Sequence, residues 1–160
     1  MKIRARSALP LLCLAIAACV SLPYRNPPGR DVAEIIFHNE ADAVATAEIF
    51  GRAEACKKRR VTGPIAAGGA VSARLPAGRP VSFSLGYKGA GAGGPYCRVY
   101  ATFSPALHAQ YAAFIRPGPE GCRLELRRHA DLAAGAGERV EFRRREPAPH
   151  PLTEYSRFCR

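Results

Sequence analysis

Apolar and polar residues alternate along most of the chain after Asp31, which is the period-two pattern of strands with one buried face. The clearest case is "VSFSLGY", in which Val81, Phe83 and Leu85 share one face while Ser82 and Ser84 share the other. The pattern predicts eight short strands, at residues 32–38, 45–52, 70–75, 80–88, 96–104, 109–116, 122–128 and 139–145.

The segments between these runs are rich in turn formers, as in "PAGRP", "GAGAGGP", "SPA" and "RPGPEG". Eight short strands joined by such turns indicate an all-β fold, a single compact antiparallel β-sandwich of about seven or eight strands. We expect this domain to cover residues 31–160, with an irregular proline-containing tail from Glu146.

The first 18 residues have the order of a secretory signal. Lys2, Arg4 and Arg6 precede an apolar stretch, residues 8–18, that contains no acidic residue. A stretch of this length is well short of the roughly 20 residues that a helix needs to cross a bilayer. The sequence therefore predicts export.

Two processing sites are compatible with this signal. Ala15-Ile16-Ala17 fits an ordinary signal peptidase, which would cut before Ala18 and release a soluble periplasmic or secreted protein. Ile16-Ala17-Ala18-Cys19 resembles the lipobox of bacterial lipoproteins, and the resemblance implies a diacylglycerol on the Cys19 thiol, with residues 1–18 removed. Cys13 lacks the small residue before it, so of the two early cysteines Cys19 alone fits the second pattern.

We favour the lipoprotein interpretation, with Cys19 lipidated and residues 19–30 forming a short proline-rich tether. Val20 and Ser21 follow the cysteine in place of the aspartate that retains many such proteins at the inner membrane. By that resemblance, the expected location is the periplasmic leaflet of the outer membrane, and the expected partners include the membrane itself.

Four cysteines remain in the domain: Cys56, Cys97, Cys122 and Cys159. Their spacing contains no Cys-x-x-Cys pair, so neither a zinc ribbon nor a redox pair is indicated. An even number of cysteines in an exported protein predicts two disulfides. Three connectivities are possible, and we rank Cys97 to Cys122 with Cys56 to Cys159 first, because Cys97 and Cys122 occupy similar phases of their strands.

The formal charge is +11, and it falls by three to +8 when Lys2, Arg4 and Arg6 leave with the signal. The densest basic runs, which we take as candidate anion-binding residues, are Lys57, Lys58, Arg59 and Arg60 in "CKKRR", and Arg143, Arg144 and Arg145. In the envelope they could bind anionic lipids, lipopolysaccharide, cell-wall polymers or acidic proteins. Charges of this kind also protect exposed strand edges. Export argues against nucleic acid.

Charge also suggests a strand register. If residues 122–128 and 139–145 are antiparallel neighbours, placing Arg127 opposite Glu141 and Glu125 opposite Arg143 gives two complementary pairs. A shift of two residues would instead put Arg127 beside Arg139. The first register is our prediction.

No catalytic motif is visible, and we expect no cofactor and no metal. "GAGAGG", residues 89–94, matches a dinucleotide-binding glycine pattern, but a strand-like segment follows where a phosphate-binding helix would be required, so a hairpin loop is expected. The histidines have no metal-ligand spacing. An enzyme whose site forms only in the folded structure is a remaining alternative.

The stretch from "LPAGRPVSF" to "CRVYATFSPALHAQYAAFIRPGPEGC", residues 75–122, resembles the carboxyl-terminal part of small lipoproteins of Gram-negative bacteria. The resemblance implies a disulfide-bearing β domain and transfers no functional residue. The expected function is that of a non-catalytic binding or accessory module of an envelope assembly, and the alternative is a basic surface that binds anionic lipids or polymers.

Overall fold

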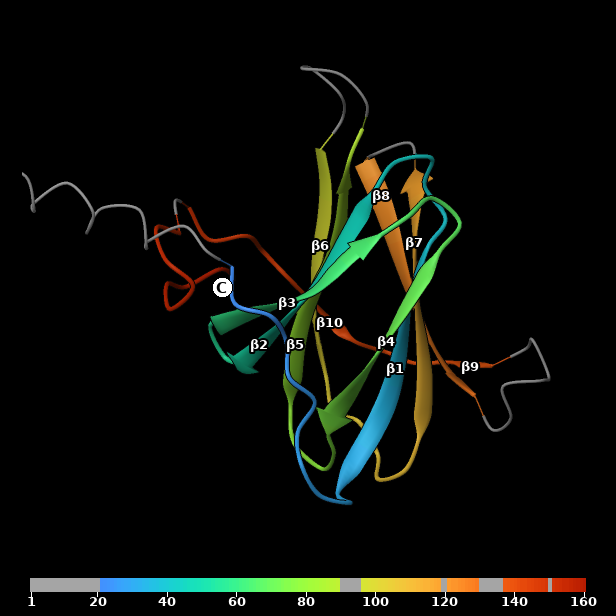
Figure 1. Cartoon of the computed structure of the whole chain (residues 1–160), viewed down its shortest axis with the longest axis vertical. Coiled ribbons are helices and arrows are strands. Elements are labelled where there is room, and N and C mark those ends of the chain that lie inside the picture. Colours follow the sequence, from blue (N-terminus) through green and yellow to red (C-terminus); the bar gives the residue numbers. More distant parts are fainter. Residues whose placement is uncertain (1–20, 90–95, 119–120, 130–136, 150) are drawn as a thin grey trace, which may run out of the picture.

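Two five-stranded sheets pack face to face and enclose the apolar side chains of the alternating segments (Figure 1). The computed structural model describes residues 21–89, 96–118, 121–129, 137–149 and 151–160. The first sheet has the order β4-β1-β7-β8-β9 and the second β10-β6-β5-β2-β3. The strands are β1 (Val32–Asn39), β2 (Ala45–Arg52), β3 (Lys57–Ile65), β4 (Ala70–Pro76), β5 (Val81–Lys88), β6 (Tyr96–Phe103), β7 (Gln110–Gly118), β8 (Gly121–His129), β9 (Glu138–Arg139) and β10 (Arg143–Arg145).

The predicted all-β sandwich is therefore confirmed, and most of its neighbouring strands are antiparallel. One pair is parallel, because β1 and β7 run side by side with Ile35 opposite Tyr111. The chain visits the other sheet twice between these two strands, so no hairpin joins them, and a parallel pair requires such a long connection.

The core lies between the sheets and follows the predicted phase. Val81, Phe83, Leu85 and Tyr87 of β5 all belong to it, and Phe83 packs against the rings of Phe37 and Phe103. Fully burying each of these side chains contributes roughly 1.5 to 3 kcal/mol. The core is the part of the fold that the alternation predicts best.

The sequence did not indicate β3, which pairs with β2 at the edge of the second sheet. Its side chains show no alternation of buried and exposed positions, because segments near Ser21 and Glu154 cover its outer edge. Pro64 is tolerated there since an edge strand does not need every N–H. The register shifts next to Gly63, whose φ of 110° favours glycine, so a bulge interrupts the pattern as well.

The register that we predicted for the carboxyl-terminal strands is wrong. Arg127 lies opposite Arg139, and β9 ends there. The segment then crosses to the other sheet (Figure 1), where β10 places Arg143 opposite Thr102 of β6. The like-charged pair is tolerated because Glu125 contacts both arginines, at 2.8 Å from Arg127 Nε and 3.6 Å from Arg139 Nη2.

The two disulfides join the cysteines that we ranked together. Cys97 and Cys122 link β6 to β8 across the two sheets with a Cα–Cα distance of 5.7 Å. Cys56 and Cys159, with a Cα–Cα distance of 5.3 Å, attach the carboxyl-terminal tail to the turn between β2 and β3. The tail thus covers the outer face of the second sheet, where Phe50, Tyr100 and Phe158 form a small second core with this disulfide.

The segment that we expected to be a tether lies on the domain from Ser21 onward. The Tyr24 N–H donates to the Val61 carbonyl at 2.8 Å, and the Val61 N–H donates to the Leu22 carbonyl at 3.0 Å. Burial raises the pKa of Tyr24 to about 12, and its hydroxyl donates to the Arg74 carbonyl. These contacts also pair the free backbone edge of β3, which would otherwise invite association with another chain.

Candidate functional site

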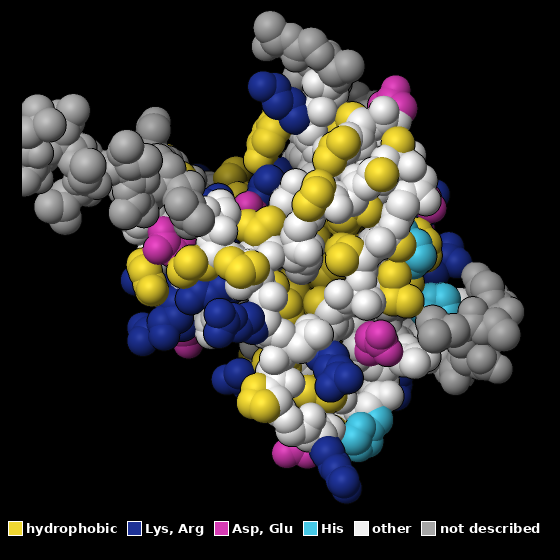
Figure 2. All heavy atoms as spheres, viewed as in Figure 1, with side chains coloured by type: hydrophobic (Ala, Val, Ile, Leu, Met, Phe, Trp, Pro, Cys, Tyr) yellow, Lys and Arg dark blue, Asp and Glu magenta, His cyan; other side chains and the backbone are white. Residues whose placement is uncertain are grey.

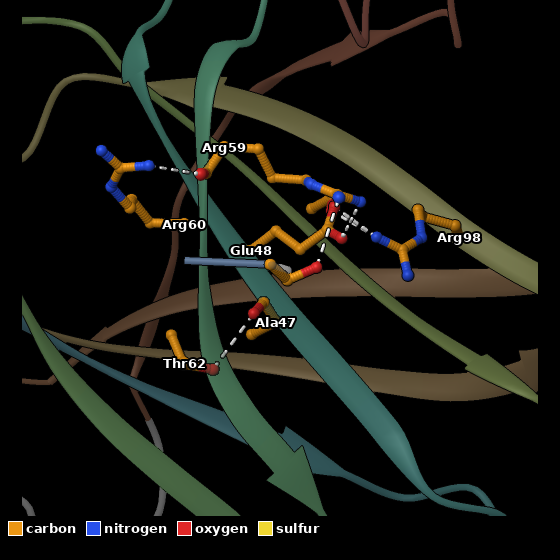
Figure 3. A network of polar contacts seen from close by, with 8 residues as sticks. Ala47, Glu48, Arg59, Arg60, Thr62 and Arg98 are labelled. Atoms are coloured by element: carbon orange, nitrogen blue, oxygen red, sulfur yellow. Dashed lines mark hydrogen bonds and ion pairs between the residues drawn. The ribbon is translucent and has the colours of Figure 1, made fainter. Parts of the chain in front are cut away.

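A buried carboxylate, Glu48 of β2, lies at the centre of a polar network on the outer face of the second sheet (Figure 3). Its side chain is 5% exposed, and its two oxygens accept from three directions. Arg98 of β6 forms an ion pair with Oε2, Arg59 of β3 lies 3.4 Å from Oε1, and the Ser84 hydroxyl of β5 donates to Oε2 at 2.8 Å.

The carboxyl-terminal tail covers part of this network. The guanidinium of Arg59 lies 4.8 Å from the ring centroid of Phe158. The backbone N–H of Arg59 donates to the backbone carbonyl of Glu154. Burial alone would lower the pKa of Arg98, but the charge and hydrogen bond of Glu48 more than offset this and raise the pKa of Arg98 above its ordinary value. The network is therefore a buried ion-pair contact, in which Glu48 and its arginines are stable only together.

Sequence reasoning missed this network. Glu48 occupies the polar phase of β2, which in an isolated sandwich would face water. The available signal was the tail: Phe158 and Cys159 are apolar residues after a proline-rich segment, and a disulfide to Cys56 would bring them over that polar face. The proline content of the tail predicts an irregular segment but does not indicate which face it covers.

The predicted basic runs lie on strands at opposite edges of one sheet. Lys57 to Arg60 belong to β3 and Arg143 to Arg145 belong to β10, with β6, β5 and β2 between them. The fold therefore does not bring the two runs together. Within the second run, Arg145 donates to the carbonyls of Arg160 and Glu54, so it fixes the tail.

The side chains of the first basic run lie on both sides of β3. Arg59 points to Glu48, while Arg60 points to the opposite side of β3 (Figure 3). Lys58 is exposed and Lys57 half-buried at the start of the strand. Figure 2 shows Lys and Arg side chains gathered where β2 ends and β3 begins, next to the segment that starts at Ser21. This basic end of the β2–β3 hairpin is the strongest candidate site.

A second arginine cluster lies on the outer face of the first sheet. Glu125 of β8 contacts Arg116, Arg127 and Arg139, and Arg116 also reaches Glu40 at 2.9 Å. The hydrogen bond from Arg127, with the charges of Arg127, Arg116 and Arg139, lowers the pKa of Glu125. Here the arginines already have carboxylate partners, which leaves less of their charge for a ligand.

Cys19 and the glycines of residues 90–95 lie outside the described residues. Strands β5 and β6 pair antiparallel on either side of that glycine-rich stretch, as in a hairpin. Across the described part of the chain, no His, Cys, Asp and Glu side chains gather in a group of three that could hold a metal ion. In the same part, no helix is long and apolar enough to span a membrane.

No protein-family model matches the chain, and no curated protein sequence matches it either.

Proposed function

We propose that the chain is an outer-membrane lipoprotein, anchored through Cys19, whose β-sandwich acts in the periplasm as a non-catalytic binding module of an envelope assembly. The observation that carries the proposal is the attachment of the amino-terminal segment to β3 from Ser21 onward. Arg59 Nη2 lies 3.3 Å from the Ser21 hydroxyl, and Leu22 and Tyr24 pair with Val61. A lipid on Cys19 would be separated from these contacts by Val20 alone.

Such a short connection would fix which side of the domain faces the bilayer. The side nearest Ser21 is the basic end of the β2–β3 hairpin, and a juxtamembrane Lys or Arg contributes about 1 kcal/mol of attraction to an anionic leaflet. Several acyl chains, each contributing about 0.8 kcal/mol per buried CH₂, would make the attachment nearly irreversible. The two disulfides fit the same oxidising compartment.

The anchor is tested in Gram-negative cells by mass spectrometry of the mature amino terminus and by fractionation of two variants. We expect a thioether-linked diacylglycerol on Cys19, and we expect Cys19→Ala to leave the membrane fraction. Cys13→Ala is the matched control, because it removes a cysteine from the same signal without changing the lipobox, and it should fractionate as the wild type. An unmodified terminus at Ala18 would contradict the proposal.

The binding role is tested by crosslinking in intact cells, followed by purification through a tag after the exposed Arg160. A specific envelope protein recovered with the wild type, and lost when Lys57 and Lys58 are changed to Glu, supports a protein partner at the basic end. The control is Arg143→Glu with Arg144→Glu, which reverses the same number of charges at the other edge of the sheet. Equal recovery with all three proteins would contradict a partner at this end.

As a second function we propose that the same basic end binds anionic lipid or polymer directly. The observation that favours it is the grouping of Lys57, Lys58 and Arg60 beside the segment that would lead to the lipid. Such binding should weaken as salt rises, because exposed charges are screened beyond about 8 Å at physiological ionic strength. Co-sedimentation with phosphatidylglycerol vesicles across a salt series measures this, and binding that is indifferent to salt would contradict it.

A further inference from the structure

A pocket of about 520 Å³ opens beside Arg60, on the side of β3 that faces away from Glu48. Residues near the end of β2, the start of β5 and the end of β4 line it, and the amino-terminal segment completes it through Tyr24, Arg25 and Pro27. Its volume lies within the range of about 300 to 1,000 Å³ that is typical of small-molecule sites. The amino-terminal segment, which is attached to β3, thus forms one side of the pocket.

The pocket is both apolar and cationic. The accessible apolar part of its wall comes from Tyr24, Pro27, Pro76 and Pro80. Ile49, Phe50 and Val81, which the fold buries in its two cores, lie beneath this wall. Four arginines, Arg25, Arg52, Arg60 and Arg79, share the lining with one acid, Glu54.

These arginines differ from those of the two carboxylate networks. In the described part of the chain, none of the four lies within ion-pair distance of a carboxylate, whereas Arg59 and Arg98 share Glu48, and Arg116, Arg127 and Arg139 share Glu125. The Arg60 guanidinium donates to the Arg59 carbonyl through Nη1, which leaves most of its five donors available. Guanidinium groups that lack an acid are suited to a phosphate or carboxylate, which they bind through two parallel hydrogen bonds.

The two properties together define the ligand. A small inorganic anion would satisfy the arginines but leave the apolar wall in water, and an uncharged apolar molecule would fill the wall but leave the arginines without a counter-charge. An anion that carries an apolar chain satisfies both. The lining residues Tyr24 and Arg25 follow Cys19 closely in sequence, so the pocket would lie near the bilayer if the chain is anchored there.

We propose that this pocket binds an anionic amphiphile, with the phosphate or carboxylate head held by Arg60, Arg79 and their arginine neighbours, and the apolar part held against Tyr24, Pro76 and Pro80. The inference deepens the proposed binding function and rests on it for the nearness of the membrane. The same chemistry could come from the head group of a membrane lipid or from a free amphiphile released into the periplasm.

The test uses the purified full chain carrying Cys19→Ser, so that no lipid anchor contributes, and titrates it with decyl phosphate below its micelle concentration. Three proteins are compared by calorimetry: the parent, Arg60→Gln with Arg79→Gln, and the control Arg143→Gln with Arg144→Gln. The control removes the same charge from β10, where both side chains are exposed. Inorganic phosphate and octyl glucoside probe the head and the apolar part separately.

We expect saturable binding of decyl phosphate that weakens about tenfold or more for each pocket arginine removed, and by less than about threefold in the control. Either single-feature probe should bind far more weakly than decyl phosphate. Equal weakening in both double variants, or inorganic phosphate binding as tightly as decyl phosphate, would overturn the pocket. Unfolding curves of the three proteins should coincide, which separates loss of binding from loss of fold.

A second arm distinguishes the source of the amphiphile. Phosphatidylglycerol and phosphatidylcholine vesicles are offered to the same three proteins. If the ligand is a membrane lipid, the pocket variant loses its preference for phosphatidylglycerol. If it is a free amphiphile, vesicle binding is unchanged while decyl phosphate binding is lost. If the chain binds decyl phosphate but carries no lipid on Cys19 in cells, the proposed ligand site is supported and the proposed lipid anchor is contradicted. The two proposals therefore fail separately.

Discussion

Arg59 and Arg60 are neighbours on β3, and the structure gives them opposite surroundings (Figure 3). Arg59 shares the buried Glu48 with Arg98 and lies against Phe158 of the tail. Arg60 lines an apolar pocket with three other arginines, none of them paired with a carboxylate in the described residues. Two adjacent cations of one basic run therefore have different environments, because a strand sends successive side chains to opposite faces.

The largest loss of stability should follow removal of the disulfide that holds the tail over Arg59. Cys56→Ser with Cys159→Ser opens a loop of 103 residues, which is worth about 4.7 kcal/mol in chain entropy. Cys97→Ser with Cys122→Ser, whose separation is 25, should cost about 3.5 kcal/mol by the same relation. Urea unfolding measures both losses. A larger loss for the Cys97–Cys122 pair than for the Cys56–Cys159 pair would contradict the structural importance of the tail.

The next largest effect tests the charged network itself. Glu48→Gln leaves Arg59 and Arg98 close together without their carboxylate, and removing one partner of a buried pair costs about 3 to 5 kcal/mol. Glu146→Gln is the control, because Glu146 pairs with Arg160 on the surface, where such pairs contribute about 0 to 1 kcal/mol. Similar unfolding free energies for the two variants would show that the buried ion pairs of Glu48 contribute no more to stability than a surface pair.

A smaller, pH-dependent effect comes from the arginine cluster on the other sheet. Arg127, Arg116 and Arg139 hold the pKa of Glu125 below its ordinary 4.5, so the unfolded chain takes up this proton first as the pH falls. The contribution of Glu125 is complete above pH 4.5 and is lost as the pH falls through the lowered pKa. Glu125→Gln should therefore be less stable than the wild type at pH 7, with the difference shrinking at lower pH; a constant difference would refute this.

The smallest effect on stability is expected for Arg60→Gln. Its side chain has no carboxylate partner in the described residues, so the unfolding free energy should change by no more than about 0.5 kcal/mol. Arg59→Gln, which breaks a contact with Glu48, should cost about 1 to 3 kcal/mol. A loss for Arg60→Gln as large as that for Arg59→Gln would remove the distinction between the two arginines.

The sequence predicts the strands whose alternation is set by the core, including β2 with its limits at Ala45 and Arg52. The alternation does not predict strands that are covered on one side by a segment distant in the sequence. Residues of β3 do not alternate because segments near Ser21 and Glu154 cover its edge. Charge pairing failed for residues 139–145 because a third group, Glu125, satisfies both arginines and the segment changes sheets.

The candidate site shows the same limit. The basic run from Lys57 to Arg60 is visible in the sequence, but its division between a buried network and a pocket depends on the amino-terminal segment and the tail. Three of the four pocket arginines, Arg25, Arg52 and Arg79, come from separate segments and form no run. Local patterns cannot group such residues, because the fold brings them together.

The most direct test of the account is the affinity of decyl phosphate for Arg59→Gln and Arg60→Gln, measured by calorimetry in the Cys19→Ser chain where both variants are folded. The two substitutions remove the same charge one residue apart. We expect Arg60→Gln to weaken binding about tenfold or more and Arg59→Gln to retain the affinity of the parent. Equal affinities for the two variants would contradict it.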